Sequence, residues 1–278
     1  MAWSKNMDWS KFYQLPQPFP ELYLKRLGVS RQPVSRAFLD ELIQAHLLTI
    51  PFENLDVTDL GLPVSIEPEQ LMEKLLLRSR GGFCFELNGA FSLLLSSLGF
   101  DAWICPCRQL RHSEPCPVPA THCGILIYLD GKVLFCDVGY GGPVPRGSLE
   151  FRVNFTQYVG EDAFSLQTSS LIPRPPRYES NNAGWYTLIR RSANHEELPL
   201  MQILPAACYL CDFYGQSALR SSGDTAYEVR HVSKMLTDGF VDLTGNQLTV
   251  ATNNSVQKRD IADWELKPVL KEWFQIVL

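Results

Sequence analysis

The sequence predicts an α+β protein organised in three successive parts. The first part, residues 1–95, carries apolar residues at the i, i+3, i+4 spacing of amphipathic helices. The second part, residues 96–199, contains short runs of β-branched and aromatic residues separated by Gly, Pro and Ser, which is typical of an antiparallel sheet or barrel. The third part, residues 200–278, mixes both patterns. A chain of 278 residues has room for one large domain or for two to three small ones.

The composition is that of a globular protein. Hydrophobic residues make up 45% and charged residues 20% of the chain, and no segment approaches the roughly 20 apolar residues that cross a bilayer. Residues 1–19 show no apolar core or cleavage site of a secretory signal, which predicts a cytoplasmic protein whose eight cysteines are mostly reduced. The net charge of -5, without a long run of one sign, argues against nucleic acid and favours a small-molecule partner.

Three helices are expected in the first part. Ser35 is a plausible cap for one and Pro68 a first-turn residue for another, and the segment IPFENLD between them ends the first helix at Pro51. The third helix begins within RGGFCFELN and ends at Gly99, so Cys84 lies at its N-terminus. The apolar residues that define these helices are Phe38, Leu42 and Ile43; Leu71, Met72, Leu75 and Leu76; and Leu87, Phe91, Leu94, Leu95 and Leu98.

Strands are expected at four places in the second part. The runs are AWICPCRQL (102–110), HCGILIYL (122–129), KVLFCDV (132–138) and GWYTLIRR (184–191). A proline-rich loop, residues 172–184, lies inside or beside this sheet. In the third part a C-terminal helix is expected from the spacing of Leu270, Trp273, Phe274 and Val277.

A cysteine at the start of a helix is a candidate nucleophile, but the helix alone does not activate it. A free thiol has a pKa of about 8.5, and only the thiolate attacks. The helix dipole contributes about 0.3 to 1 kcal/mol, or up to ~2 kcal/mol in sheltered geometry, which lowers the pKa by about one unit. Cys84 therefore needs a histidine that accepts its proton.

Five histidines compete for that role. His112 lies in a loop flanked by proline and cysteine, and His46 falls in a helix, where a partly buried histidine is more often structural. His195 and His231 stand among charges, with no carboxylate that strand geometry would place beside them. His122 differs because it opens the first of two expected strands that a tight turn joins.

The turn between those strands places a carboxylate near His122. Asp130-Gly131 is a strong signal for a two-residue type I′ hairpin turn. In that register Gly124 lies opposite Asp137, and His122 shares their face as a diagonal neighbour of Asp137, at roughly 7 to 8 Å between backbones unless a bulge intervenes. Asp137 could then fix the tautomer of His122 and support its imidazolium. The sequence thus predicts a catalytic triad of Cys84, His122 and Asp137.

The stretch RGGFCFELN, residues 80–88, matches the signature R-G-G-x-C-x-E-x-N, and with it the chain resembles the arylamine N-acetyltransferases. IPFENL (50–55) is similar to the upstream P-F-E-N-L segment of that family, and residues 121–142 resemble its strand pair with histidine and aspartate. The order Cys, His, Asp is shared with transglutaminase-like cysteine enzymes. The resemblance is at motif level up to about residue 145 and architectural beyond.

The resemblance implies a three-domain cysteine acyltransferase fold: an N-terminal helical bundle (1–95), a central antiparallel β-barrel (96–199) and a C-terminal α/β lid (200–278) on a transglutaminase-like core. It also implies a ping-pong reaction without a metal. Cys84 takes the acetyl group from acetyl-CoA, and an arylamine, hydrazine or N-hydroxyarylamine removes it.

Further residue roles are implied by the same resemblance. Arg80 and Glu53 form an ion pair that braces the active-site loop. The cleft for acceptor or cofactor is lined by Thr121, Tyr140, Gly141 and Gly142. An oxyanion hole is needed for acyl transfer, and the backbone N–H of Cys84 is expected to donate to it. Residues 211–223 depart from the family's N-x-x-x-S-x-x-S-x-F-like segment, which leaves the CoA contacts of the third part and the acyl donor open.

Four other functions remain possible at this point. A zinc site would draw on Cys105, Cys107, His112, Cys116, His122 and Cys123, but one residue between Cys105 and Cys107 is too few for the usual C-x₂₋₄-C spacing, and Cys208 with Cys211 is a lone pair. An amide synthase or a transglutaminase-like hydrolase could use the same triad. A catalytically silent binding protein of this fold would be expected to have lost part of it.

Overall fold

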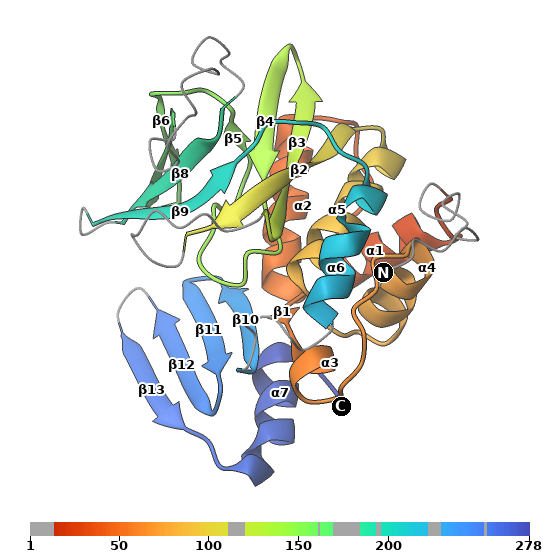
Figure 1. Cartoon of the computed structure of the whole chain (residues 1–278), viewed down its shortest axis with the longest axis vertical. Coiled ribbons are helices and arrows are strands. Elements are labelled where there is room, and N and C mark those ends of the chain that lie inside the picture. Colours follow the sequence, from red (N-terminus) through yellow and green to blue (C-terminus); the bar gives the residue numbers. More distant parts are fainter. Residues whose placement is uncertain are drawn as a thin grey trace.

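The computed structural model of the chain describes residues 14–110, 120–160, 162–168, 184–192, 196–221, 229–252 and 255–278. Outside them lie the expected proline-rich loop apart from Gly184, and also His112, Cys116 and His195. The described elements follow the predicted order: helices come first, then a large antiparallel sheet, then a mixed part (Figure 1). The α+β fold class predicted from the sequence is confirmed.

The helices of the first part begin and end where local signals place them. The hydroxyl of Ser35 accepts the N–H of Phe38 at 3.2 Å and so caps the second helix. That helix ends before Pro51, whose ring cannot continue it. The helix after Pro68 changes to π geometry at Met72. The described helices of this part are α1 (Phe19–Leu27), α2 (Arg36–Thr49), α3 (Leu55–Thr58), α4 (Pro68–Leu71) with its π-helical continuation η2 (Met72–Leu77), and α5 (Cys84–Leu98).

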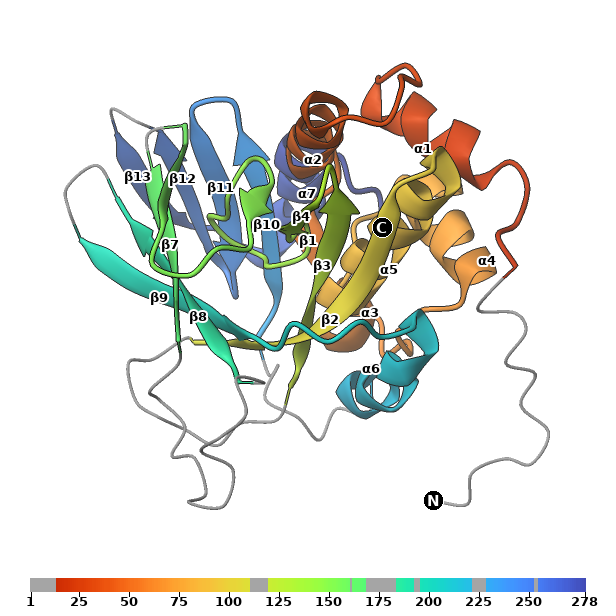
Figure 2. The ribbon, with the colours of Figure 1, turned by 90° about the horizontal axis from the view of Figure 1, so that it is seen from above.

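Helix α5 is the central helix of the molecule. It begins at Cys84, and Gly99 ends it in the left-handed conformation with φ 98°. Its predicted apolar stripe is buried along its whole length. Figure 2 shows α5 beside the strands β2 (Asp101–Gln109) and β3 (His122–Leu129), which it contacts directly. The first residue of α5 is therefore held close to the barrel.

An eight-stranded antiparallel sheet forms the barrel. Its strands lie in the order β5-β4-β3-β2-β9-β8-β7-β6, and the two end strands approach each other. The N–H of Glu150 donates to Gln157 Oε1 at 2.7 Å, and the Gln157 amide donates back to Glu150 O at 2.8 Å. These bonds join the two edges that an open sheet would leave exposed. The bounds are β2 (Asp101–Gln109), β3 (His122–Leu129), β4 (Lys132–Cys136), β5 (Leu149–Glu150), β6 (Thr156–Val159), β7 (Asp162–Thr168), β8 (Tyr186–Arg191) and β9 (Glu197–Ile203).

A second sheet forms the C-terminal lid, by which we mean β10–β13 and α7. The edge strand of this sheet, β1, comes from the helical part and not from the lid, and Phe52 of β1 lies opposite Ser233 of β10. Helix α7 covers one face and shares a core with the strands. The remaining bounds are β1 (Phe52–Glu53), the 3₁₀ turn η4 (Leu210–Phe213), α6 (Tyr214–Ser221), β10 (His231–Leu236), β11 (Gly239–Thr244), β12 (Gln247–Thr252), β13 (Val256–Asp260), the 3₁₀ turn η5 (Asp263–Glu265) and α7 (Leu266–Phe274).

The C-terminal helix is shorter than the sequence predicts. It ends at Phe274, where Gln275 takes the left-handed conformation with φ 60°. Val277, which the spacing places in the helix, lies beyond its end and is 70% exposed, so that expectation was wrong. The spacing of apolar residues continues past the last hydrogen-bonded turn, so this spacing alone does not show where the helix ends.

The two boundaries expected from composition fall inside elements. The first, after residue 95, lies within α5, which continues to Leu98, and the second, after residue 199, lies within β9, which stays in the barrel sheet to Ile203. We propose the same three parts with boundaries at the ends of these two elements.

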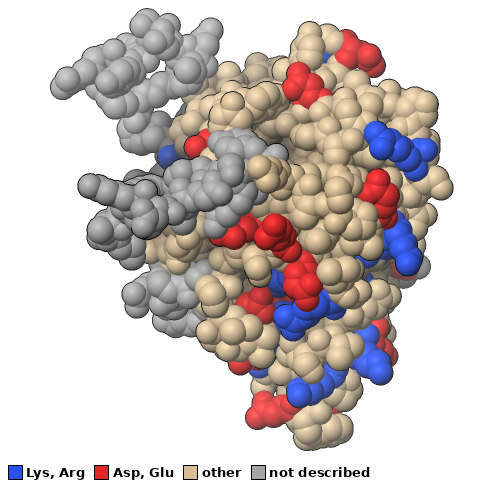
Figure 3. Space-filling view, turned by 90° about the vertical axis from the view of Figure 1, so that its right-hand side faces the viewer, with Lys and Arg blue, Asp and Glu red and all other residues tan. Residues whose placement is uncertain are grey.

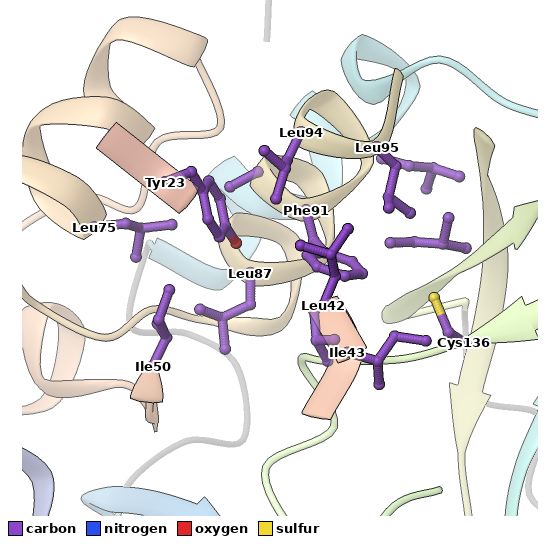
Figure 4. Close-up of a cluster of buried hydrophobic side chains, with 14 of the residues drawn as sticks. Tyr23, Leu42, Ile43, Ile50, Leu75, Leu87, Phe91, Leu94, Leu95 and Cys136 are labelled. Atoms are coloured by element: carbon purple, nitrogen blue, oxygen red, sulfur yellow. The ribbon is translucent and has the colours of Figure 1, made fainter. Parts of the chain in front are cut away.

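The largest core cluster ties the helices to the barrel. In Figure 4, Leu42 and Ile43 of α2 lie beside Phe91 of α5, and Cys136 of β4 approaches them from the strand side. All four side chains are at most 2% exposed. This packing fixes α5 relative to the hairpin of β3 and β4.

No described helix is long and apolar enough to span a membrane. On the face drawn in Figure 3, the described Lys and Arg side chains are interspersed with Asp and Glu.

Candidate active site

The hairpin of β3 and β4 has the predicted register. Asp130 and Gly131 form the turn with φ of 51° and 75°, the positive values that a type I′ turn requires. Leu129 lies opposite Lys132, and pairing continues without a bulge to Ile125 opposite Cys136. Continuing that register places His122 and Asp137 on the same face of the hairpin.

The structure brings His122 and Asp137 into direct contact. Nε2 of His122 lies 2.6 Å from Oδ2 of Asp137, and both side chains are at most 1% exposed. Burial alone lowers the pKa of His122, but the Asp137 carboxylate and Cys84 outweigh it and raise that pKa to about 10. The ring is therefore an imidazolium at neutral pH.

Cys84 lies beside this pair at the first residue of α5. It is 3% exposed, and its sulfur lies 3.9 Å from the carbonyl oxygen of Thr121. The second ring nitrogen of His122, Nδ1, is buried and has no hydrogen-bond partner in the part of the chain that the structure describes. Because Nε2 is taken by Asp137, Nδ1 is the ring atom available to the thiol. The three residues of the predicted triad are thus neighbours.

Asn88 is a fourth member of the site that the sequence reasoning did not assign. Its amide donates to Asp137 Oδ1 and to Cys123 O, both at 2.8 Å. Its carbonyl oxygen accepts the N–H of Val138 at 2.9 Å. Asn88 stands one helical turn after Cys84, and that i, i+4 spacing was the available signal that both side chains face the barrel.

Two glycines of the site are required by close packing. A Cβ at Gly139 would lie 2.9 Å from the carbonyl oxygen of Cys84, and one at Gly81 would lie 2.3 Å from Pro51 O. Neither Gly81 nor Gly82 has a positive φ. The position of the RGG stretch before a helix suggests that its glycines allow a tight turn, but their backbone does not require glycine. Glycine is needed instead because β1 and the residue before it pack closely against this stretch.

The ion pair implied by the family resemblance is present. Arg80 Nε and Nη2 donate to the two carboxylate oxygens of Glu53 at 2.7 and 2.9 Å, and Nη2 also reaches Asp56 at 2.9 Å. Burial lowers the pKa of Arg80, but the two carboxylates raise it above its ordinary value. The bidentate geometry fixes the orientation of the guanidinium.

A lysine extends this charged network toward Cys84. Lys74 lies 2.6 Å from Asp56 and 2.8 Å from Glu86, and Glu86 accepts the N–H of Phe83 at 2.7 Å. Burial raises the pKa of Glu86, and the ammonium of Lys74 opposes that rise. The backbone of Phe83, the residue before Cys84, is thus held by the carboxylate of Glu86, which forms an ion pair with Lys74.

Three of the four residues expected to line the cleft border a small cavity. Tyr140, Gly141 and Gly142 line a cavity of about 20 Å³ together with residues of β10. The ring of Tyr140 lies 6.0 Å from that of His122, edge to face. Thr121 does not border this cavity, and its carbonyl faces the Cys84 thiol instead.

The expectation that His231 lacks a neighbouring carboxylate was wrong. Its Nε2 lies 2.6 Å from Asp242 Oδ2 on the adjacent strand. His46, by contrast, bonds to the Tyr23 hydroxyl at 2.9 Å in the helical core. Complete burial and the charge of Arg26 lower the pKa of His46 to about 3, so it stays neutral and structural.

The described cysteines do not form a metal site. Within the described ranges, no three His, Cys, Asp or Glu side chains gather as metal ligands. Cys107 donates to Cys105 O at 3.7 Å, and Cys123 donates to Cys84 O at 3.8 Å. Burial raises the pKa of Cys107 and Cys123, which keeps them as thiols. His112 and Cys116 of the alternative zinc set lie outside the described residues.

Known proteins resemble this chain in sequence and in structure. A family model described as N-acetyltransferase matches residues 37–278. An arylamine N-acetyltransferase of Mycobacterium tuberculosis is 37% identical over 135 residues, which cover 46% of this chain and 47% of that protein. The aligned part thus spans about half the length of this curated relative.

Solved structures share the whole architecture. The arylamine N-acetyltransferase structure from M. tuberculosis superposes with a TM-score of 0.82 at 25% identity, over 92% of this chain and 93% of that one. That of Mycobacterium marinum, in complex with CoA, superposes with a TM-score of 0.80 at 24% identity, over 92% of each chain. The predicted fold of helical bundle, barrel and lid is confirmed by these likenesses.

Proposed function

The chain belongs to the arylamine N-acetyltransferase family, and we propose on that premise that it transfers an acetyl group from acetyl-CoA through Cys84 to an arylamine, hydrazine or N-hydroxyarylamine. One observation carries the proposal: a cysteine at a helix N-terminus lies beside a buried His122–Asp137 pair whose imidazole is charged at neutral pH. The relative from M. marinum that is in complex with CoA supports CoA as the acyl carrier.

The first half-reaction forms an acetyl-enzyme. In the resting enzyme His122 holds the proton of Cys84 on Nδ1, and Asp137 stabilises the imidazolium through Nε2. The Cys84 thiolate attacks the acetyl carbonyl carbon, and the N–H of Cys84, which as the first residue of α5 precedes the ladder of helical bonds, donates to the oxyanion. The C–S bond to CoA then breaks, and the departing sulfur takes the proton from His122.

The second half-reaction returns the enzyme to its first state. The amine nitrogen attacks the Cys84 thioester, and His122, now neutral, accepts a proton from that nitrogen. Collapse of the intermediate breaks the C–S bond of the thioester and releases the acetylated amine. Cys84 leaves as a thiolate next to the imidazolium, so the proton count is unchanged over one cycle.

Mass spectrometry of the intact protein tests this proposal. The protein is incubated with acetyl-CoA and no amine, and one acetyl group on Cys84 with release of an equal amount of CoA is the expected result. Adding an arylamine should remove that acetyl group. The Cys84→Ala variant should remain unmodified, while Cys208→Ala, a matched change at a half-buried cysteine, should behave like wild type. A wild-type protein that neither gains acetyl nor releases CoA would exclude the acetyltransferase function.

The same experiment separates the enzymes that share the triad. An amide synthase would carry a different acyl group on Cys84 and ignore acetyl-CoA. A hydrolase would release acetate from the acetyl-enzyme without an amine.

A further inference from the structure

Strand β10 forms one wall of the cavity beside the triad. Its residues Ser233, Lys234 and Met235 face the segment that joins β4 to β5, residues 137–148, which we call the cleft loop. On the loop side the wall is formed by Tyr140, Gly141 and neighbouring residues. The space between the walls is about 20 Å³, enough for about one water molecule, so any larger group that enters there contacts both walls.

This cavity adjoins the catalytic residues. Tyr140 in the loop wall is the residue whose ring meets His122. Phe52, which also lines the cavity, lies 5.7 Å from the ring of Phe83, the residue before Cys84. The cavity between β10 and the cleft loop is therefore lined by residues that contact His122 and the residue before Cys84.

The N-terminal end of β10 is clamped by Asn54. Asn54 Oδ1 accepts the N–H of His231 at 2.7 Å, and Nδ2 donates to Val229 O at 3.0 Å. The backbone N–H of Asn54 adds a bond to His231 O at 3.2 Å. The side chain thus uses both its donor and its acceptor on this one segment of the lid.

The same segment holds the loop that leads to Cys84. Glu53 N–H donates to Gly82 O at 2.9 Å, and Gly82 N–H donates to Pro51 O at 3.2 Å. Strand β1 lies beside β10 (Figure 1), and its residue Phe52 also forms a bridge with Gly82. This end of β10 is rigidly connected to the catalytic centre.

The C-terminal end of β10 is clamped by Arg146 of the cleft loop. Arg146 Nη1 donates to Thr237 O and Nη2 to Gly239 O, each at 2.9 Å. Thr237 lies in the turn that joins β10 to β11, and Gly239 is the first residue of β11. The cleft loop is in turn anchored to α2, because Ser148 N–H donates to Asp40 at 2.6 Å. Arg146 therefore ties the far end of the lid strand to a loop that cannot easily follow it.

We propose that Arg146 is a positioning residue for the acyl donor, because it fixes the distance between the far end of β10 and the cleft loop. The inference rests on the acetyltransferase function proposed above and names a residue that acts on the donor through β10. Lys234, a residue of the β10 wall, favours a donor that carries negative charge, as the phosphates of CoA do. Losing Arg146 frees only one end of the strand, since Asn54 and β1 hold the other.

Steady-state kinetics of Arg146→Met test the inference. This change keeps the apolar stem and removes both hydrogen bonds to the turn. We expect the KM for acetyl-CoA to rise by about three- to tenfold, because each lost bond from a charged donor weakens the position of the wall. The rate and pH profile of Cys84 alkylation by iodoacetamide should stay as in wild type, since the triad is untouched. Arg146→Lys, which keeps one charged donor, should give an intermediate KM.

Arg152→Met is the matched control. Arg152 lies in the same part of the chain and stacks its guanidinium 4.6 Å from the ring of Phe155, away from the turn, so its KM should equal that of wild type. An unchanged KM in Arg146→Met would overturn the inference, and so would a slower alkylation of Cys84 without a change in KM. If wild type forms no acetyl-enzyme at all, the proposed function fails instead, and the two failures are thereby distinguished.

Discussion

The molecule contains two His–Asp pairs of the same geometry, one beside Cys84 and one in the lid. In both, His Nε2 lies 2.6 Å from the carboxylate Oδ2 of an aspartate; Asp242 lies on the adjacent antiparallel strand β11, and Asp137 directly follows β4. In the lid, His231 lies opposite Thr244, and Asp242 comes two residues before Thr244 on the same strand. Continuing the register of β3 and β4 gives His122 and Asp137 the same diagonal offset.

The surroundings of the two pairs differ in burial and in the third partner. The side chains of His122 and Asp137 are 1% and 0% exposed, whereas those of His231 and Asp242 are 16% and 21% exposed. His122 has the Cys84 thiol beside it. The ring of His231 instead lies 5.1 Å from the ring of Phe52, and the backbone N–H of His231 donates a hydrogen bond to Asn54.

This difference shows that a His–Asp pair is not a catalytic site by itself. A pair becomes a candidate where a thiol at a helix N-terminus meets the free ring nitrogen and where water is excluded. In the lid the same pair joins two strands, and we assign it no catalytic role.

The largest expected effect separates the two pairs directly. His122→Gln should lower kcat/KM for acetyl transfer by about 10³-fold or more, because the thiol loses its proton acceptor. His231→Gln should change kcat/KM by less than about threefold, because that pair is partly exposed and touches no reacting atom. Comparable losses in both variants would mean that the lid pair takes part in the chemistry.

Asn88 should matter less than His122 but more than its neighbours on α5. Asn88→Ala removes the bond to Asp137 and the bonds to the backbone of the hairpin, so kcat should fall by about 10- to 100-fold. Ser92→Ala, one turn further along the helix, removes only a bond to Gly89 O and should leave kcat near wild type. If Asn88→Ala were as active as Ser92→Ala, Asp137 would not need the amide for its orientation.

The pH dependence of folding gives a third contrast. The pKa of His122 is raised from 6.5 to about 10 in the folded protein, so its protonation stabilises the fold fully below about pH 6.5, and this contribution is lost as the pH rises toward 10. The free energy of unfolding, measured in urea, should therefore fall across this range. Asp137→Asn removes the principal group that raises the pKa and should flatten that fall. Parallel curves for wild type and variant would show that the imidazolium is not stabilised by Asp137.

The smallest expected effect concerns the stability of the lid. Asp242→Asn weakens the bond to His231 in a partly exposed pair, so the free energy of unfolding should drop by about 1 kcal/mol or less. The acetylation rate of Cys84 should not change. A loss of several kcal/mol would indicate that the pair holds the lid to the rest of the molecule.

The hairpin with the triad was predictable because its signals are local. Asp130-Gly131 determines a type I′ turn, and the period of two then assigns every side chain of β3 and β4 to a face. The lid hairpin contains a similar Asp238-Gly239 signal, but there the turn is Thr237-Asp238. If Asp238 and Gly239 formed the turn, as Asp130 and Gly131 do in the other hairpin, the pairing of β10 with β11 would shift. His231 would then lie opposite Asn246 and away from Asp242.

By itself, then, the sequence determined the order of the helical and strand-rich parts, the strands β2, β3, β4 and β8, the start of α5 at Cys84 and the contact of His122 with Asp137. Each depends on residues close together in the chain or joined by one tight turn. Only the tertiary structure decided that Asn54 and Arg146 hold the two ends of β10, and that Lys74 links Asp56 to Glu86. Periodicity reports which face of an element is buried, whereas the partner on that face depends on how distant elements pack, and no local pattern records it.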